Sequence, residues 1–273
     1  MGQELHLPNP ALATADTHFQ PAALNYAHHL RPMREADFFI SMDVDEFINI
    51  RVGDGTLPAL FAAAGAFDVL SITEINHGAN RRETYERGWV LDQFPLYQTL
   101  APGPRRARRG VKSIVRLSEK VERRRNHRPD MSDTTGTVVW LDGSGRDQTS
   151  LPADRGENGL DCRGPYGLVR LEHFALRALD SYLAKMNRGD VVIKGKQVSR
   201  SYWRTRNRNE EANADYGDRL MCAKDYFARH FQSDTRLMDL HDTACAAHAD
   251  RIARLVADPV FLDRRNRALS EAW

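Results

Sequence analysis

A short acidic segment between two apolar runs constrains this chain more than any other part of its sequence. Residues 38–50 read FFISMDVDEFINI, so that three carboxylates interrupt a stretch of aromatic and β-branched side chains. Such a run predicts a buried strand over residues 38–42, with the acids at its carboxyl end. Ligands bind at the carboxyl ends of strands in open α/β sheets, so the segment marks a candidate site.

The acids of this segment predict a metal site. Asp43, Asp45 and Glu46 repel one another at close range, and a divalent cation offsets that repulsion. Alternation along an extended chain puts Asp43 and Asp45 on one side, with Val44 facing the other. Their hard oxygen ligands suit Mg²⁺ or Mn²⁺, with Asp45 as the direct ligand and Glu46 as its neighbour. The alternative is a solvated acidic turn after a strand.

Composition excludes several classes of protein. The chain has 273 residues, and 39 basic minus 37 acidic residues give a net charge of +2, which excludes a globally basic nucleic-acid binder. No apolar stretch approaches the roughly 20 residues that span a bilayer. The opening MGQELHLPNP lacks the basic and apolar regions of a signal peptide. Three widely spaced cysteines show no metal or disulfide pattern, so we expect a reducing, cytoplasmic compartment. They are Cys162, Cys222 and Cys245.

Strands and helices are predicted to alternate in the first part of the chain. We expect a short strand at 3–7, a helix at 22–33, a turn and helix start at 54–58 with the helix continuing over 60–64 until Gly65 ends it, and a strand at 67–72. Alternation of this kind predicts an α/β fold in which helices flank a parallel or mixed sheet.

The second part of the chain is less regular. Residues 105–128 carry eleven basic and two acidic side chains, which form either a phosphate clamp or a solvated face. Residues 142–167 are predicted to be an irregular loop, and residues 168–186 to become helical in their later part. A helical region follows at 214–273, interrupted near Asp258-Pro259.

Two motifs carry a resemblance to a known family. The segment MDVDEFI resembles the "DvDEF" signature of bacterial family 2-like glycosyltransferases with the GT-A fold. Far downstream, LEHFALRA at 171–178 and YLAKMNRG at 182–189 resemble the segment that follows the acceptor region in that family. The resemblance covers roughly residues 5–200. It implies a GT-A-like domain at 1–200 and a separate C-terminal helical region at 201–273.

The resemblance implies a metal-dependent enzyme that moves a sugar from a nucleotide-diphosphate donor to a glycan or another hydroxyl acceptor, with inversion. His173, in the downstream motif, is implied as a further metal ligand beside Asp43 and Asp45. Lys112 matches a lysine that the family places before a short strand. We expect Asp43, Lys112 and His127 to contact the donor.

The acceptor hydroxyl must lose a proton to a general base. Glu74 follows the strand predicted at 67–72 and is our candidate, with His77 as the alternative base. Each also has a plainer interpretation as a polar residue at the end of a strand. With Asp45, Glu74 completes the predicted catalytic pair.

The N-terminal part departs from the family pattern. The family opens with a lysine-asparagine-glutamate segment that helps to hold the nucleotide base, and nothing like it precedes Asp43. We therefore expect the fold to be N-terminally incomplete and nucleotide binding by this chain to be weak. The alternative is that the base is recognised in a different way. The alternative function is a non-catalytic fragment that binds a polyanionic glycan through its arginines. A nucleic-acid module is disfavoured because aromatic residues do not interleave with the basic run.

Overall fold

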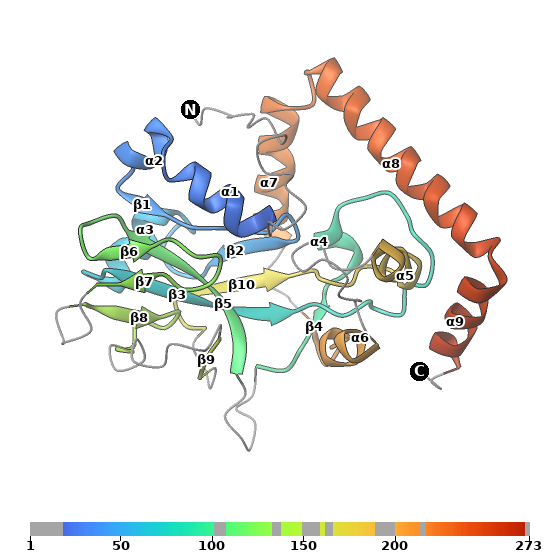
Figure 1. Cartoon of the computed structure of the whole chain (residues 1–273), viewed down its shortest axis with the longest axis horizontal. Helices are drawn as coiled ribbons and strands as arrows, with labels where there is room; N and C mark the ends of the chain where they lie inside the picture. Colours follow the sequence, from blue (N-terminus) through green and yellow to red (C-terminus); the bar gives the residue numbers. More distant parts are fainter. Residues whose placement is uncertain are drawn as a thin grey trace. The chain divides into compact units, whose positions relative to one another are not determined.

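The computed structural model describes residues 19–100, 108–132, 138–148, 159–161, 166–188, 200–212 and 217–270. They form a mixed α/β fold with a curled mixed sheet and several helices (Figure 1). The chain divides into two compact units: the first holds the described residues of 1–74 and 100–172, and the second those of 75–99, 173–190 and 195–273. The boundary predicted at residue 200 stays a prediction, and the strand predicted at 3–7 lies outside the described residues.

The sheet follows the strand order β1-β5-β3-β10-β2. These strands are β1 (Phe38–Phe39), β5 (Arg108–Arg116), β3 (Val69–Asn76), β10 (Val169–His173) and β2 (Glu46–Ile50). Strand β3 pairs antiparallel with β5 and parallel with β8 (Trp140–Asp142), while β9 (Gly159–Asp161) pairs antiparallel with β5. The sheet is therefore mixed, as the alternating pattern predicts.

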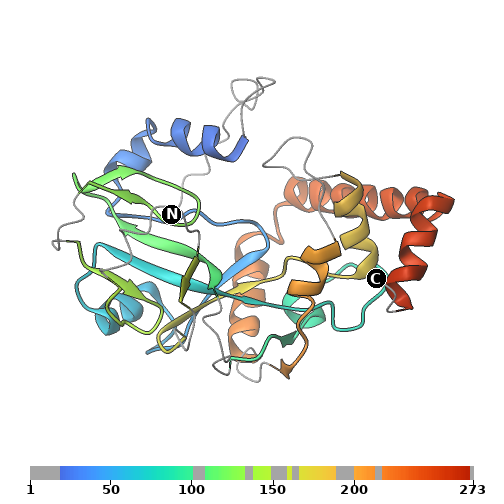
Figure 2. The same ribbon diagram turned by 60° about the horizontal axis from the view of Figure 1, so that its bottom comes forward.

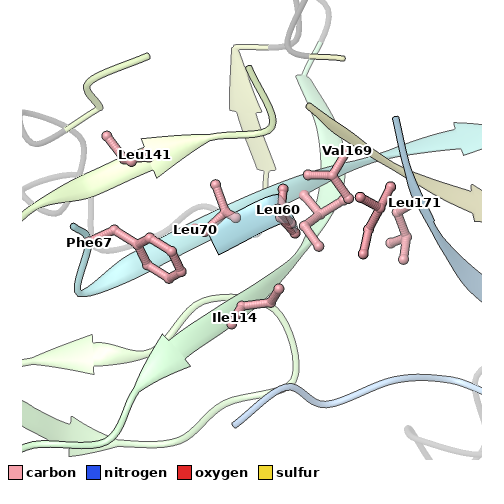
Figure 3. Close-up of a cluster of buried hydrophobic side chains, with 9 residues drawn as sticks. Leu60, Phe67, Leu70, Ile114, Leu141, Val169 and Leu171 are labelled. Atoms are coloured by element: carbon pink, nitrogen blue, oxygen red, sulfur yellow. The ribbon is translucent and has the colours of Figure 1, made fainter. Parts of the chain in front are cut away.

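The register of β3 against β5 assigns their side chains to two faces. Ile72 lies opposite Lys112, and Leu70 lies opposite Ile114, so these four side chains share one face. That face carries the main hydrophobic core of the first unit (Figure 3). Its buried members are Ile50, Leu60, Phe67, Leu70, Ile72, Ile114, Leu141, Val169 and Leu171. Lys112 thus projects from the apolar face of the sheet, where a charged group needs a partner.

The helices of the first unit follow their local signals. Helix α3 (Leu57–Ala64) begins after Thr56, whose hydroxyl accepts a hydrogen bond from Ala59 N–H at 3.4 Å. It ends at Gly65, which has a φ of 76° that favours glycine. The single helix predicted at 22–33 is wrong, because the chain forms α1 (Phe19–Ala27) and α2 (Arg31–Glu35). Pro32 explains the break, since it lacks an N–H and belongs in a first helical turn.

Two predictions about strands need correction. The strand predicted at 38–42 is only Phe38–Phe39 long, because the chain then turns and a new strand begins at Glu46. The irregular loop predicted at 142–167 contains β9, which pairs with β5. Part of the basic run forms a small antiparallel pair of strands, β6 (Val121–Arg123) and β7 (Asp130–Met131).

The second unit is mostly helical. Its strands β4 (Leu96–Tyr97) and β11 (Glu211–Ala212) pair antiparallel. Its helices are α4 (Val90–Gln93), α5 (Leu179–Arg188), α6 (Arg200–Arg206), α7 (Gly217–His230), α8 (Thr235–Val256) and α9 (Pro259–Leu269). The orange-to-red end of the chain in Figure 2 is helical, as predicted, and α8 is its longest element.

The interruption near Asp258-Pro259 is also confirmed. The Asp258 carboxylate accepts a hydrogen bond from Val260 N–H at 2.8 Å, and Pro259 opens α9. A second break separates α7 from α8, where Asp234 accepts from Leu237 N–H at 3.0 Å. Among the described helices, none has both the length and the apolar character needed to cross a bilayer.

Candidate functional site

The acidic segment forms a closed turn. The Glu46 N–H donates to the Asp43 carbonyl oxygen at 3.1 Å, and the Asp43 N–H donates to Glu46 Oε2 at 2.9 Å. Val44 lies at the tip with 94% of its surface exposed. The extended conformation predicted through Asp43 and Asp45 is therefore wrong. A turn satisfies the backbone groups here, and the Glu46 carboxylate folds back onto its start.

Two carboxylates of this turn, those of Asp43 and Glu46, converge on a buried lysine. Lys112 is 0% exposed, and its Nζ lies 3.0 Å from Asp43 Oδ2 and 3.4 Å from Glu46 Oε2. The same ammonium donates to Asn126 Oδ1 at 2.5 Å. Each of its three N–H groups can therefore meet an oxygen. The positive charge of Lys112 offsets the repulsion between the two carboxylates. The carboxylates in turn offset the free-energy cost of burying the ammonium.

Asn126 and His127 complete this cluster. The Ser41 hydroxyl donates to Asn126 Oδ1 at 2.9 Å, which fixes the amide oxygen toward Lys112. His127 donates from Nδ1 to the Val111 carbonyl oxygen at 3.0 Å, and its own carbonyl accepts from the Ser113 hydroxyl at 2.7 Å. The tautomer follows from the carbonyl partner: Nδ1 carries the proton and Nε2 is left as an acceptor.

Burial keeps His127 neutral. Desolvation is the largest cause that lowers its pKa, and the positive charge of Lys112 lowers that pKa further. The hydrogen bond to the Val111 carbonyl and the negative charges of Asp43 and Glu74 act in the opposite direction without reversing the shift. His127 therefore interacts electrostatically with Lys112, Asp43 and Glu74, so the four residues lie in one neighbourhood.

Glu74 reaches this neighbourhood from β3. It lies one residue beyond Thr73, which pairs with Val111, and it is 8% exposed. A methyl group added at Gly110 would lie 2.9 Å from Glu74 Oε2 and 3.0 Å from its Cδ. The carboxylate therefore occupies space that only a glycine at residue 110 leaves open. Four predicted site residues, Asp43, Glu74, Lys112 and His127, are brought together from distant parts of the sequence.

His77, the alternative base, and His173, the further metal ligand that the resemblance implies, both belong to the second unit. His77 is 1% exposed, its Nδ1 donates to the Phe94 carbonyl oxygen at 2.7 Å, and its ring stacks on Phe174 with centroids 4.0 Å apart. That buried packing role argues against His77 as the alternative base. His173 is 8% exposed, and its carbonyl oxygen accepts from His77 N–H at 3.0 Å. Its role as a metal ligand stays a prediction.

The acidic turn fits one kind of metal site and not another. Across the parts of the chain that the structure describes, no group of three His, Cys, Asp or Glu residues is arranged to hold a metal ion. A closed structural metal centre is thus not formed by these residues. Mg²⁺ in phosphate-binding sites instead uses one or two carboxylates together with substrate phosphates. Asp43, whose side chain is 40% exposed, and the half-buried Asp45 fit that second arrangement.

Several described arginines of the basic run have partners within the protein. Arg124 contacts His28, and Arg125 pairs with Asp130 at 2.7 Å. The Arg128 guanidinium lies 4.9 Å from the centroid of the Trp140 ring. These contacts engage guanidinium groups that a phosphate clamp would use. The predicted clamp by residues 105–109 concerns side chains that the structure does not describe.

Some residues of the cluster carry no recognisable signal in the sequence. Asn126 stands in a run of arginines, and Gly110 follows two of them, so neither belongs to a chemical motif. Asn49 and Glu172 form a further buried link, in which the Asn49 amide donates to Glu172 Oε1 at 2.7 Å. The pattern of apolar residues indicates that these segments are strands, but only the sheet register shows which polar groups meet.

No protein-family model matches the chain, and a search of curated proteins found no match either. The assignment of function therefore depends on the two sequence motifs and on the geometry of the acidic turn.

Proposed function

We propose that this protein is a metal-dependent glycosyltransferase of the family 2-like group with the GT-A fold. It would transfer a sugar from a nucleotide-diphosphate donor to a glycan or another hydroxyl acceptor, with inversion. One observation carries the proposal: the DVDEF turn presents the carboxylates of Asp43 and Glu46 to Lys112, in the same cluster as His127 and Glu74. A solvated acidic turn would not have a buried lysine as its partner.

Asp43 and Asp45 are the residues that would hold the cation. When bound, Mg²⁺ or Mn²⁺ neutralises charge on the departing diphosphate. The backbone of the turn that carries both residues is held by the bond from Glu46 N–H to the Asp43 carbonyl and by the bond from Asp43 N–H to the Glu46 carboxylate. His173 is the further ligand that the sequence resemblance implies.

Glu74 is the proposed general base. Its carboxylate is buried on β3, and Gly110 leaves room for it. A carboxylate held on a strand has less freedom than one on a loop, which favours a defined approach to an acceptor hydroxyl. His127, neutral and with Nε2 as an acceptor, would orient the donor or the acceptor rather than bind phosphate as a cation.

The alternative, a non-catalytic fragment that binds a polyanionic glycan, depends on available arginines. The pairing of Arg125 with Asp130 offsets part of the positive charge that the described part of the basic run offers, and the contact with His28 engages the Arg124 guanidinium. The acidic turn also opposes a polyanion. The transferase proposal is therefore the better supported of the two.

The metal assignment can be tested by calorimetry. Mn²⁺ binding is measured for the wild type, for Asp45→Ala and for a control, Asp54→Ala. Asp54 is a suitable control because it is an exposed aspartate whose carboxylate accepts from the Thr56 N–H and hydroxyl in another turn. The proposal predicts that only Asp45→Ala weakens binding. Equal binding by all three proteins would remove the acidic turn as the metal site.

A further inference from the structure

The ammonium of Lys112 lies beside the Asp43 carboxylate that a divalent cation bound to the acidic turn would use. It is 3.0 Å from Asp43 Oδ2, 3.4 Å from Glu46 Oε2 and fully buried. A divalent ion on the Asp43 carboxylate would lie within a few ångströms of this positive charge. Like charges at such separation repel strongly where water is scarce, so the two cations compete for Asp43.

Lys112 can leave Asp43 without losing every partner. Its Nζ also donates to Asn126 Oδ1 at 2.5 Å, and the Glu46 carboxylate stays within ion-pair distance. Asn126 is itself held by Ser41, so this second partner does not depend on Asp43. Asp43 is the more exposed member of the cluster, with 40% of its side chain accessible against 4% for Glu46. Exchange of the Lys112 ammonium for a divalent cation is therefore easiest at Asp43.

We propose that Lys112 is the resident counter-ion of the acidic turn, and that a divalent cation must displace its ammonium from Asp43. This inference rests on the proposed function, because it takes the turn to be the metal site. Lys112 is then a positioning residue: it holds the turn closed in the absence of metal and weakens binding of the bare ion. The cation binds well only when a diphosphate adds ligands of its own.

The test measures the dissociation constant of Mn²⁺, without nucleotide, by electron paramagnetic resonance. Lys112→Met removes the charge and keeps an unbranched side chain, while Lys112→Arg keeps the charge and serves as the matched control. Loss of the competing ammonium should tighten Mn²⁺ binding by about tenfold or more in Lys112→Met. Lys112→Arg should bind no more tightly than the wild type. The double variant Lys112→Met with Glu46→Gln removes one charge of each sign and covers the case in which Lys112→Met does not fold.

The outcomes separate this inference from the proposed function. Equal Mn²⁺ affinity in the wild type and Lys112→Met, with weaker binding in Asp45→Ala, would overturn the inference and leave the metal site intact. Absence of Mn²⁺ binding in every folded variant would overturn both. Tighter binding in Lys112→Met that Asp43→Asn abolishes is the result that the inference predicts.

A second measurement uses the unaltered protein. The chain has six lysines, so a carbon-13 lysine spectrum is simple, and the signal missing in Lys112→Arg identifies Lys112. Addition of Mg²⁺ with inorganic pyrophosphate should shift the Lys112 Cε signal as the ammonium changes partners. A Lys112 signal that stays in place while Mg²⁺ binding is detected by calorimetry would contradict the exchange.

Discussion

The buried ammonium of Lys112 forms an ion pair with the carboxylate of Asp43 at 3.0 Å, across 69 residues of sequence. One partner lies on strand β5, and the other begins the turn that leads into β2. The pair therefore ties the acidic turn to the sheet. It also makes the conformation of the proposed metal ligands depend on a residue that is not itself a metal ligand.

Loss of the lysine should destabilise the first unit. Lys112→Met leaves Asp43 and the buried Glu46 without their shared cation, and breaking a buried pair from one side costs about 3–5 kcal/mol. Urea denaturation of the variant should show this loss. Glu46→Gln and the double variant complete a cycle in which the two changes should be less than additive. Additive effects would mean that the 3.4 Å contact contributes little.

A methyl group at residue 110 should displace the proposed base. In Gly110→Ala the new Cβ would lie 2.9 Å from Glu74 Oε2, so the flexible carboxylate must move. Because the backbone need not move, we expect stability to change by no more than about 1 kcal/mol. Sugar transfer should fall by roughly a hundredfold, since misplacement of a reacting group is costly.

The control for that variant is Gly167→Ala, whose new Cβ would lie 3.2 Å from the Ser144 hydroxyl and not from an acid. Transfer rates and thermal melting are measured for both variants. Full activity of Gly110→Ala, with its melting temperature unchanged, would exclude Glu74 as the base.

His127 should make the protein less stable in mild acid. Burial lowers its pKa in the folded state, so the unfolded chain, with a pKa near 6.5, takes up the proton more readily. Its contribution is fully present above about pH 6.5 and is lost as the pH falls from there toward the folded-state pKa. His127→Asn, which keeps a donor for the Val111 carbonyl, should reduce the slope of stability against pH in that window.

A parallel variant is His248→Asn, because burial also lowers the pKa of His248 in the second unit and its loss should reduce the slope in the same direction. Chemical denaturation between pH 5 and pH 8 compares the wild type with both variants. An unchanged slope in His127→Asn would show that His127 takes up its proton equally well in the folded chain.

Elements with strong local signals are predictable from this sequence. Helix α3 has a capping threonine at 56 and a terminating glycine at 65, and α9 begins at Asp258-Pro259. The sequence also singles out the acidic cluster, Glu74, Lys112 and His127 as candidate site residues. Local signals fail where a long-range interaction decides: at Asp43–Glu46 a turn replaces the predicted extended conformation, and the carboxylates of Asp43 and Glu46 lie against Lys112.

The contacts within the site could not be predicted in the same way. The pairing of Lys112 with Asp43 depends on the register of β3 against β5, which places Lys112 opposite Ile72. Asn126 contributes an amide oxygen because a loop after β6 returns to β5, and no spacing in the sequence encodes that return. A shift of one residue in the register would turn Lys112 to the opposite face of the sheet.

The most direct test of the central claim is turnover of a donor. Release of nucleoside diphosphate is measured from a panel of uridine, guanosine and thymidine diphosphate sugars, with and without Mn²⁺, for the wild type and Asp45→Asn. The proposal predicts Mn²⁺-dependent release from at least one donor and its loss in Asp45→Asn, with equal melting of both proteins in chelator. Release that persists in Asp45→Asn, or no release from any donor by the folded wild type, would contradict the claim.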